Sequence, residues 1–215
     1  MAAEIEIKIC GLTRPDDARL AATSGATWLG VVFASGPRVV SAEQARAIVS
    51  AAARPVLGVF GPQSPDEILR LRDAAGLAGA QLHGAYDAAD AARLRAEGLV
   101  VWRVVRLAGE EDLDRVAEAA CEADAVLVEP RVAHADGGAG IALALPLALR
   151  ARGRLAGARM VLAGGLTPET VGSAVGLVTP DVVDVSSGVE IRPGIKDPSK
   201  MHRFVEAVRA YRPPA

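Results

Sequence analysis

The 215-residue chain has little of what marks several common classes of protein. It contains only two cysteines, Cys10 and Cys121, too few for the disulfide framework of a small secreted domain. Its longest apolar run, residues 140–149, is interrupted by Pro146 and is shorter than the about 20 residues that a transmembrane helix needs. Charged residues divide the first apolar segment, which is therefore unlike a signal peptide. We expect a soluble, cytoplasmic protein that does not insert into membranes.

Neither sign of charge dominates the chain. The 24 Lys and Arg residues and the 26 Asp and Glu residues give a formal net charge of −2, and no block is rich in Lys and Arg. Nucleic acid and anionic membranes are therefore not expected as partners. Lysine itself is rare, because its only occurrences are Lys8, Lys196 and Lys200.

Several catalytic motifs are also absent. The three histidines, His83, His134 and His202, lie far apart without the spacing of metal ligands, so no metal site is predicted. The chain has no G-x-S-x-G sequence, which argues against a Ser-His-Asp hydrolase. No G-x-G-x-x-G follows the first predicted strand, which argues against a dinucleotide-binding fold.

Short β-rich runs alternate with longer helical patterns along the whole chain, and no linker divides it. Eight such β-then-α units predict a (β/α)8 TIM barrel that forms a single α/β domain over residues 1–215, with an open doubly wound sheet as the alternative. The predicted strands are Ile5–Cys10, Trp28–Phe33, Pro55–Phe60, Gly79–Leu82, Leu99–Val105, Ala125–Glu129, Met160–Ala163 and Val182–Ser186. The predicted helices are Arg14–Ser24, Ala42–Ala53, Pro65–Ala75, Ala88–Glu97, Glu110–Glu122, Ile141–Arg152, Pro168–Val175 and Pro198–Ala210.

The starts of several helices carry capping signals. Thr13, Ser41 and Ser64 each place a hydroxyl three residues before an acid or an amide, which is the spacing of a capping box. Pro168 and Pro198 each follow a residue that can cap, and proline is favoured in the first helical turn, where its missing N–H costs nothing.

The active site of a barrel lies at the C-terminal ends of its strands. After the seventh predicted strand comes the pair Gly164-Gly165, and after the eighth comes Ser186-Ser187-Gly188. Backbone N–H groups exposed at these two places match the phosphate site of many barrels, and this interpretation is favoured over simple tight turns. The glycine-rich stretch 137–140 after the sixth strand could form a third wall or a flexible loop.

Three further side chains stand out near strand ends. Cys10 closes the first strand and is open to interpretation as a nucleophile, a general base or a small buried hydrophobe, whereas Cys121 lies in a helical pattern and is interpreted as structural. His83 could contact a ligand or be a hydrogen-bonded residue of the barrel rim. Arg38 follows Gly-Pro in a loop and is either exposed to solvent or an anchor for a carboxylate.

Seven sequence blocks resemble the phosphoribosylanthranilate isomerase family, and they occur in the family's order over nearly the whole chain. These blocks are Lys8-Ile-Cys-Gly-Leu-Thr13, Phe33-Ala-Ser-Gly-Pro-Arg38, Gly58-Val-Phe60, Gln81-Leu-His-Gly84, Leu162-Ala-Gly-Gly-Leu-Thr-Pro168, Asp184-Val-Ser-Ser-Gly-Val-Glu190 and Pro193-Gly-Ile-Lys-Asp-Pro198.

The resemblance implies a reaction as well as a fold. The reaction is the Amadori rearrangement of N-(5-phosphoribosyl)anthranilate to 1-(2-carboxyphenylamino)-1-deoxyribulose 5-phosphate in tryptophan biosynthesis. It needs general acid–base catalysis on a small phosphosugar–anthranilate substrate, and the resemblance implies no cofactor and no metal. We expect a monomer or a homodimer.

The resemblance also implies roles for individual residues. Cys10 corresponds to the family's catalytic base, which must act as a thiolate and so requires a lowered pKa, from cationic groups of the site or from the substrate's iminium charge. Arg38 corresponds to the cation that holds the anthranilate carboxylate, and Asp184 to a further contact with the anthranilate group. His83 is predicted as a substrate contact from its position at a strand end. The predicted phosphate-binding residues are Gly138, Gly140, Gly164, Gly165, Ser186, Ser187 and Gly188.

The chain departs from the family pattern after the sixth strand. The family's general acid is an Asp, and the aligned residue here is Glu129, whose side chain has one more methylene. Asp136 is an alternative acid if its loop folds inward. The following loop lacks the family's hydroxyl, cation and aromatic residues.

Two competing functions are considered. The first is a catalytically impaired phosphate-binding barrel with a binding or regulatory role. The second is the related isomerase of histidine biosynthesis, which would need an Asp in place of Cys10.

Overall fold

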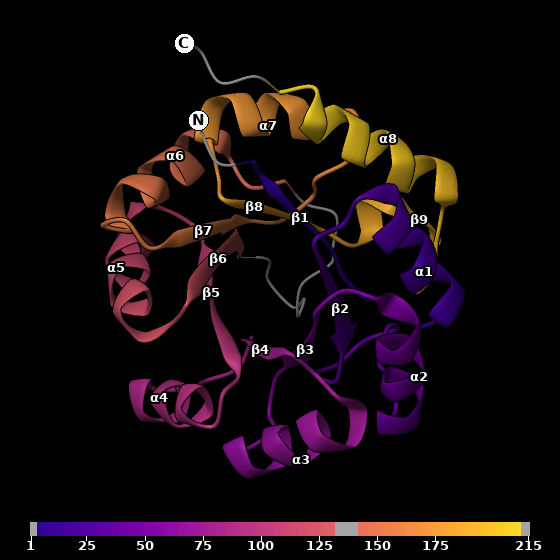
Figure 1. Ribbon diagram of the computed structural model, residues 1–215. Coiled ribbons are helices and arrows are strands. Elements are labelled where there is room, and N and C mark those ends of the chain that lie inside the picture. The colour runs from indigo at the N-terminus through magenta and orange to yellow at the C-terminus, as the bar shows by residue number, and fades with distance from the viewer. Residues whose placement is uncertain (1–3, 132–141, 212–215) are drawn as a thin grey trace.

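The computed structural model describes residues 4–131 and 142–211. Within these residues eight parallel strands form one closed barrel in chain order, with the last strand paired to the first. The helices surround the barrel, and Figure 1 shows α8 beside α1, where the ring closes. The prediction of a (β/α)8 barrel is therefore confirmed, and the open sheet is excluded.

The strands of the barrel are β1 (Glu6–Ile9), β2 (Trp28–Val32), β3 (Val56–Phe60), β4 (Gly79–Leu82), β5 (Val100–Leu107), β6 (Ala125–Pro130), β7 (Arg159–Leu162) and β8 (Val182–Val185). The helices are α1 (Pro15–Ser24), α2 (Ala42–Ala52), α3 (Pro65–Ala75), α4 (Ala88–Ala96), α5 (Leu113–Glu122), α6 (Leu145–Arg154), α7 (Val171–Val178) and α8 (Pro198–Arg209), with short 3-10 turns η1 (Glu110–Asp112) and η2 (Ser187–Val189). Most predicted strands agree with these bounds to within one or two residues.

The alternation of side chains along each strand determines which of them point into the barrel. Successive residues of a strand point to opposite faces of the sheet. On β6, Val126 and Val128 pack in the core between barrel and helices, whereas Leu127 packs in a separate cluster with Trp102 inside the barrel. Glu129 has the same parity as Leu127 and therefore points into the barrel.

The same rule places charged residues inside the barrel on other strands. Ile7 and Ile9 of β1 belong to the outer core, so Lys8 between them points inward. Val183 and Val185 of β8 likewise leave Asp184 on the inner face. Much of the remaining interior is apolar, and its two tryptophans, Trp28 and Trp102, meet edge to face with ring centroids 5.4 Å apart.

Two of the three predicted capping boxes are present. Ser41 and Ser64 each accept a hydrogen bond from the third residue of the following helix, whose side chain binds back to the cap. The prediction for Thr13 is wrong, because α1 begins after Arg14 without a side-chain cap. The Thr13 hydroxyl instead donates to the carbonyl of Gly194 at 2.6 Å, which connects the loop after β1 to a segment near the end of the chain.

The start predicted for the seventh helix is also wrong. α7 begins at Val171 rather than at Pro168, because Thr167 and Thr170 form a turn of their own. The Thr170 N–H donates to the Thr167 carbonyl at 3.2 Å, and the Thr167 N–H donates to the Thr170 hydroxyl at 3.0 Å. These bonds satisfy the backbone groups that a first helical turn would have used.

A small hairpin between β8 and α8 has no counterpart in the sequence prediction. Its strands β9 (Glu190–Arg192) and β10 (Ile195–Lys196) are antiparallel. The turn between them contains Pro193 and Gly194, and Gly194 has a φ of +81°, which glycine adopts readily. The hairpin lies beside the loops that follow β1 and β2, since Thr13 bonds to it and Arg38 contacts its first residue.

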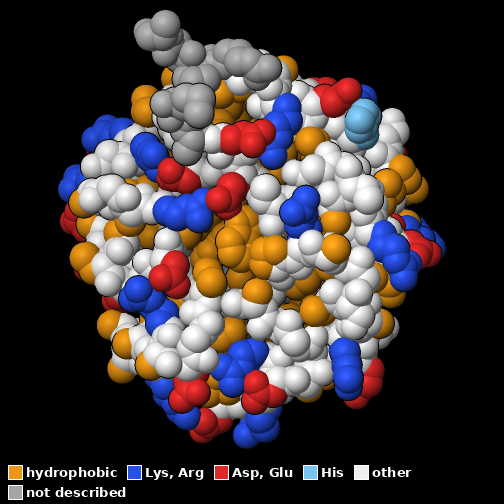
Figure 2. Space-filling model, viewed as in Figure 1, with side chains coloured by type: hydrophobic (Ala, Val, Ile, Leu, Met, Phe, Trp, Pro, Cys, Tyr) orange, Lys and Arg blue, Asp and Glu red, His pale blue; other side chains and the backbone are white. Residues whose placement is uncertain are grey.

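One face of the surface shows charges of both signs. In Figure 2, hydrophobic side chains gather near the centre of this face, and Lys, Arg, Asp and Glu side chains are interspersed around them. Among the described residues, no helix has both the length and the apolar character needed to cross a bilayer.

Two glycines with opposite surroundings test how tightly the barrel is packed. A Cβ added to Gly79 on β4 would lie 2.3 Å from the Val100 carbonyl oxygen and 2.5 Å from a Leu57 methyl carbon, whereas a Cβ on Gly153 in α6 meets nothing within 4 Å. We expect Gly79→Ala to lower the free energy of unfolding by about 1–3 kcal/mol through overpacking. The matched control Gly153→Ala should leave it unchanged or raise it by up to about 1 kcal/mol, because alanine favours a helix. Urea unfolding of both variants measures the difference, and equal midpoints would contradict the packing argument.

Candidate active site

Most of the residues predicted for the site come together at the C-terminal ends of the strands. Cys10 directly follows β1, His83 follows β4, Glu129 lies near the end of β6, and Asp184 lies on β8. Arg38 reaches the same region from the loop after β2. Gly138, Gly140 and Asp136, also predicted for the site, lie outside the described residues.

Cys10 is held by the seam between the first and last strands. Its N–H donates to the Val185 carbonyl at 2.9 Å, and its side chain is buried. Gly11 turns the chain with a φ of +72°, and a Cβ there would lie 2.5 Å from Arg38 Cδ and 2.8 Å from Ser186 Oγ. Because Gly11 has no side chain, Arg38 and Ser186, from two other loops, can approach the backbone directly after Cys10.

The cationic groups of the site do not by themselves lower the pKa of Cys10 below its ordinary value. Burial raises the pKa of the thiol, and although Lys8 lowers it, the net pKa lies above the ordinary value. Asp184 adds to the rise. The protein's own cations therefore do not produce the lowered pKa predicted for a thiolate, and the thiol is protonated at neutral pH in the structure without substrate.

Glu129 is placed by strand register. It is the partner of Arg106 across the β5–β6 pair, and Arg106 Nε donates to its Oε1 at 3.0 Å. Burial raises the pKa of the Glu129 carboxyl, and the opposing effect of Arg106 does not cancel this rise. The environment therefore favours the protonated carboxylic acid more than water does, which suits a proton donor.

His83 lies beside this pair. Arg106 Nη2 is 2.9 Å from His83 Nδ1, and because a guanidinium can only donate, Nδ1 is the acceptor. The same Nδ1 lies 3.8 Å from Glu129 Oε1. Nδ1 accepts from Arg106 and therefore carries no proton. His83 and Glu129 are thus neighbours that do not form an ion pair through this nitrogen.

Asp184 is only partly satisfied. Its Oδ2 accepts a hydrogen bond at 3.0 Å from the buried ammonium of Lys8, its register partner on β1. Its Oδ1 is buried, and no group within the described part of the chain donates to it. A buried acceptor without a partner is costly, so this oxygen is available to a donor from a ligand.

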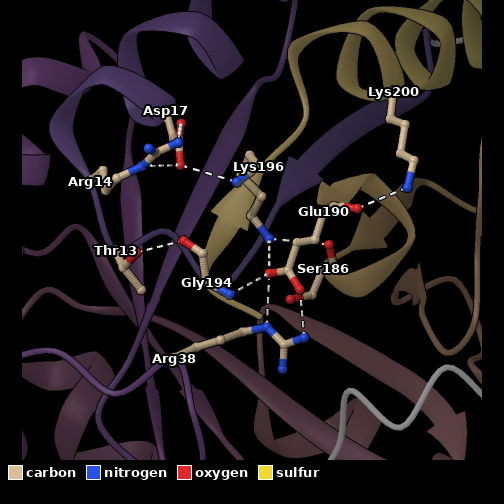
Figure 3. Close-up of polar contacts among 9 residues, drawn as sticks. All are labelled: Thr13, Arg14, Asp17, Arg38, Ser186, Glu190, Gly194, Lys196 and Lys200. Atoms are coloured by element: carbon tan, nitrogen blue, oxygen red, sulfur yellow. Dashed lines mark hydrogen bonds and ion pairs between the residues drawn. The ribbon is translucent and has the colours of Figure 1, made fainter. Parts of the chain in front are cut away.

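Arg38 does not extend freely into solvent. Its Nε and Nη2 donate to the two carboxylate oxygens of Glu190 on β9 at 2.9 and 2.7 Å, in the bidentate geometry typical of Arg and carboxylate. Figure 3 shows the third guanidinium nitrogen pointing away from Glu190. The fork that sequence reasoning assigned to a substrate carboxylate is thus occupied by Glu190, which leaves Nη1 for a ligand.

Glu190 is itself surrounded by donors, as Figure 3 shows. Besides Arg38, the buried Lys196 Nζ donates to its Oε1 at 2.8 Å, and the Gly194 N–H donates to the same oxygen at 3.2 Å. Burial alone would raise the pKa of Glu190, but Arg38 and Lys196 outweigh it and hold the pKa below the ordinary value. Behind this group, the Lys196 N–H donates to Asp17 of α1 at 3.2 Å.

The two glycine-rich loops lie against each other. Gly164 and Gly165 have φ values of +95° and +66°, and a Cβ on Gly164 would lie 2.1 Å from Pro130 Cδ. A Cβ on Gly188 would lie 1.9 Å from the Leu166 carbonyl oxygen, so glycine permits the loop after β8 to pack on the loop after β7. Ser186, Ser187 and Gly188 are half-buried along this junction.

Sequence reasoning assigned no role to several residues of the site. Lys8, Arg106, Glu190 and Lys196 bind the predicted residues, and each could have been suspected from a weak signal. Lys8 and Lys196 are two of only three lysines, and both lie inside blocks that carry the family resemblance. The roles of Glu190 and Arg106 were harder to predict from the sequence, because they depend on pairing between distant segments. In residues 4–131 and 142–211 no group of three or more His, Cys, Asp or Glu side chains is arranged to hold a metal ion.

A closed (β/α)8 barrel with a thiol, a buried carboxyl and two adjoining glycine-rich loops at the C-terminal ends of its strands has the form of a barrel enzyme. Comparison with known proteins narrows this class. The family model described as N-(5'phosphoribosyl)anthranilate (PRA) isomerase matches residues 7–207. The chain therefore belongs to the phosphoribosylanthranilate isomerase family.

Individual relatives agree with this assignment over nearly their full lengths. The N-(5'-phosphoribosyl)anthranilate isomerase of Chlorobium luteolum is 41% identical over 212 residues, which cover 95% of this chain and 97% of that protein. The Thermotoga maritima phosphoribosyl anthranilate isomerase superposes with a TM-score of 0.87 at 32% identity, over 96% of this chain and 100% of that one. Another crystal structure of a phosphoribosyl anthranilate isomerase, in complex with reduced 1-(O-carboxyphenylamino)-1-deoxyribulose 5-phosphate, has a TM-score of 0.84 at 32% identity over 96% of this chain and 100% of that one.

The raised pKa of Glu129 predicts a cost in stability at neutral pH. A carboxyl whose pKa is raised by folding binds its proton more tightly in the folded state, so the free energy of unfolding falls as pH rises through that pKa. We expect Glu129→Gln to melt at a higher temperature than the wild type at pH 7, with the difference shrinking towards pH 4. The exposed Glu110, paired with Arg150, provides the control, and Glu110→Gln should change the midpoint little. A Glu129→Gln midpoint below the wild type at pH 7 would contradict this reasoning.

Proposed function

We propose that this chain converts N-(5-phosphoribosyl)anthranilate into 1-(2-carboxyphenylamino)-1-deoxyribulose 5-phosphate by general acid–base catalysis. The match to the isomerase family over residues 7–207 carries the proposal. The inward placement of a thiol on β1 and a buried carboxyl on β6 supports it, because the reaction needs one group to give a proton and another to take one.

Glu129 is the proposed acid. It protonates the ribose ring oxygen while the bond from that oxygen to C1 breaks, and the amine lone pair forms an iminium at C1. The support is that burial raises the pKa of the Glu129 carboxyl, so a larger fraction is protonated than in water. Arg106 remains beside the carboxylate that the step produces and stabilises it through the 3.0 Å hydrogen bond.

Cys10 is the proposed base. As the iminium forms, the Cys10 thiol gives its proton to water. The resulting thiolate removes the C2 proton, and the electrons of that C–H bond form a C1=C2 double bond while the iminium nitrogen becomes neutral. The resulting enolamine gains a proton at C1 and loses one from the C2 hydroxyl, which yields the ketone with no net change in protons. Because burial raises the pKa of the free thiol, the positive charge of the iminium is the contribution that makes the thiolate accessible.

Arg38 is the proposed anchor for the anthranilate carboxylate. Glu190 fixes two of its nitrogens, so the third meets the ligand in one orientation. The group of Arg38, Glu190 and Lys196 carries a net positive charge when all three are ionised, which favours an anion. The Oδ1 of Asp184, to which no described residue donates, is a proposed acceptor for a donor of the substrate, and His83 is a proposed second contact.

The adjoining loops after β7 and β8 are the proposed phosphate site. Gly164 and Gly165 turn with positive φ, and Ser186, Ser187 and Gly188 lie on the neighbouring loop. Consecutive backbone N–H groups in such turns bind phosphate oxygens without needing a cation. Gly138 and Gly140 stay part of the proposal on sequence grounds alone.

Replacing the proposed acid and base tests the reaction. We expect Cys10→Ser and Glu129→Gln each to lower kcat by about 10²–10⁴-fold, the usual contribution of a positioned acid or base. Glu129→Asp should also be slower, by about tenfold or more, because it withdraws the carboxyl from Arg106 and small misplacements are costly. Loss of anthranilate-type fluorescence measures turnover, and complementation of a tryptophan auxotroph that lacks this isomerase tests the activity in cells.

Two outcomes would overturn these assignments. A fully active Cys10→Ser variant would remove Cys10 as the base. Tight binding of substrate by the wild type without turnover, unchanged by Glu129→Asp, would instead indicate a binding or regulatory barrel.

If Arg38 anchors the substrate, substitutions in the Arg38–Glu190 pair should change KM more than kcat. We expect Arg38→Met to raise KM about 10–100-fold, since a hydrogen bond between charged groups contributes roughly 1.5–3 kcal/mol. Glu190→Gln should raise KM less and should affect kcat less than it affects KM, because Arg38 keeps its charge and loses only part of its support. The control is Glu169→Gln, which removes an exposed ion pair with Arg203 on the surface and should change neither constant. An unchanged KM in Arg38→Met would contradict the anchor.

A further inference from the structure

A buried cation lies next to the Cys10 thiol, and the reaction described above gives it no part. Lys8 is fully buried on the inner face of β1, two residues before Cys10 and with the same parity. An ammonium ion removed from water costs several kcal/mol unless its surroundings compensate, so its presence inside a barrel calls for a physical reason.

The partners of Lys8 fix the direction of its three N–H donors. One donates to Gln81 Oε1 at 2.9 Å, across the barrel on β4, and a second donates to Asp184 Oδ2 at 3.0 Å on the neighbouring strand β8. Lys8 Nζ lies 5.7 Å from the centroid of the Trp102 ring, which covers another side of the ammonium. An ammonium has three donors, so one remains after Gln81 and Asp184.

The remaining donor has the Cys10 sulfur within its reach. A Cβ built on Gly30 of β2 would lie 2.8 Å from Cys10 Sγ and 3.2 Å from Lys8 Nζ, so the two atoms border the same small space. That space is open only because residue 30 has no side chain. Burial raises the pKa of the Cys10 thiol, and Lys8 opposes this through both charge and hydrogen bonding.

We propose that Lys8 is a positioning residue that stabilises the thiolate of Cys10 during proton abstraction, with Gln81 and Asp184 holding its ammonium in place. The proposal rests on the proposed role of Cys10 as the base. It goes beyond that role because it explains why a buried lysine, Lys8, and a residue without a side chain, Gly30, lie beside the thiol.

Other charged groups also act on Cys10, and their signs make the proposal testable. Asp184 opposes the thiolate, whereas Lys196 favours it from the hairpin, and Arg38 lies close enough to interact with it. Lys8 and Asp184 therefore have opposite expected effects on the same sulfur, although they are partners in one ion pair. A merely structural role for the pair predicts no such opposition, because removing either partner would disturb the same packing.

The rate of alkylation by iodoacetamide, measured as a function of pH without substrate, reports the thiolate directly. Cys121 is exposed on α5 and serves as the internal control within each sample, since peptide mass spectrometry separates the two thiols. We expect Lys8→Gln to slow alkylation of Cys10 at pH 7.5 by roughly tenfold or more, the effect of about one pKa unit, with Cys121 unaffected. We expect Asp184→Asn, which keeps the shape of the side chain, to accelerate alkylation of Cys10.

An unchanged Cys10 rate in Lys8→Gln, or an unchanged or slower rate in Asp184→Asn, would overturn the proposal. If Lys8→Gln does not fold, Lys8→Met, which keeps an unbranched side chain and removes the charge, repeats the measurement, and an unchanged Cys10 rate in that variant would equally overturn the proposal. In turnover assays, Lys8→Gln should lower kcat more than it raises KM and should displace the acidic limb of the kcat/KM profile to higher pH. Since alkylation needs no substrate, the two failures can be told apart: altered thiol reactivity without any isomerase activity would overturn the proposed function and the catalytic role of Lys8, and would leave only its effect on the Cys10 thiolate.

Discussion

The ion pair between Lys8 and Asp184 connects the architecture of this barrel to its chemistry. It joins the first and last strands at the seam where the barrel closes, and register makes the two residues direct neighbours. Two charges can remain inside the barrel only because each neutralises the other and further polar groups complete their hydrogen bonds. The same arrangement leaves one N–H donor of Lys8 near the Cys10 thiol, and one oxygen of Asp184 that accepts from no group among the described residues. The pair that stabilises the interior therefore also supplies polar groups to the site.

The ionisation states of Cys10 and Glu129, the two proposed catalytic groups, are set mainly by burial. Burial raises the pKa of both Cys10 and Glu129, which favours the neutral form of each. A neutral carboxyl is ready to donate a proton, whereas a neutral thiol is not ready to accept one. In the proposed mechanism, the free site is therefore prepared for ring opening by Glu129, and the positive charge that ring opening creates favours the thiolate that the next step needs. An environment that made the thiol ionised from the start would place a negative charge in the barrel before a positive one was available to balance it.

The fold and part of the site could be predicted from the sequence, for a physical reason. Helix caps such as Ser41 and strands such as those ending near Cys10 and Glu129 depend on local patterns, and a barrel then brings the strand ends together. The partners of Arg38 and Glu129 could not be predicted in this way. Glu190 meets Arg38 through a hairpin that the pattern did not reveal, and Arg106 meets Glu129 through strand register, which no local pattern encodes. Thr13 shows the reverse case, in which a correct local signal for a cap is overridden by a tertiary hydrogen bond to Gly194.

The hairpin of β9 and β10 has a consequence for the order in which the molecule can be assembled. Cys10 and Arg38 are synthesised well before the groups that hold them, at Val185, Glu190 and Lys196. Closing contacts between such distant segments has an entropic cost that short-range contacts avoid, so these contacts are expected late in folding. A nascent chain that ends before β8 already contains Cys10, Arg38 and Glu129 but lacks the partners that position the first two. The site is thus completed by the C-terminal end of the chain rather than by the residues that would carry out the reaction.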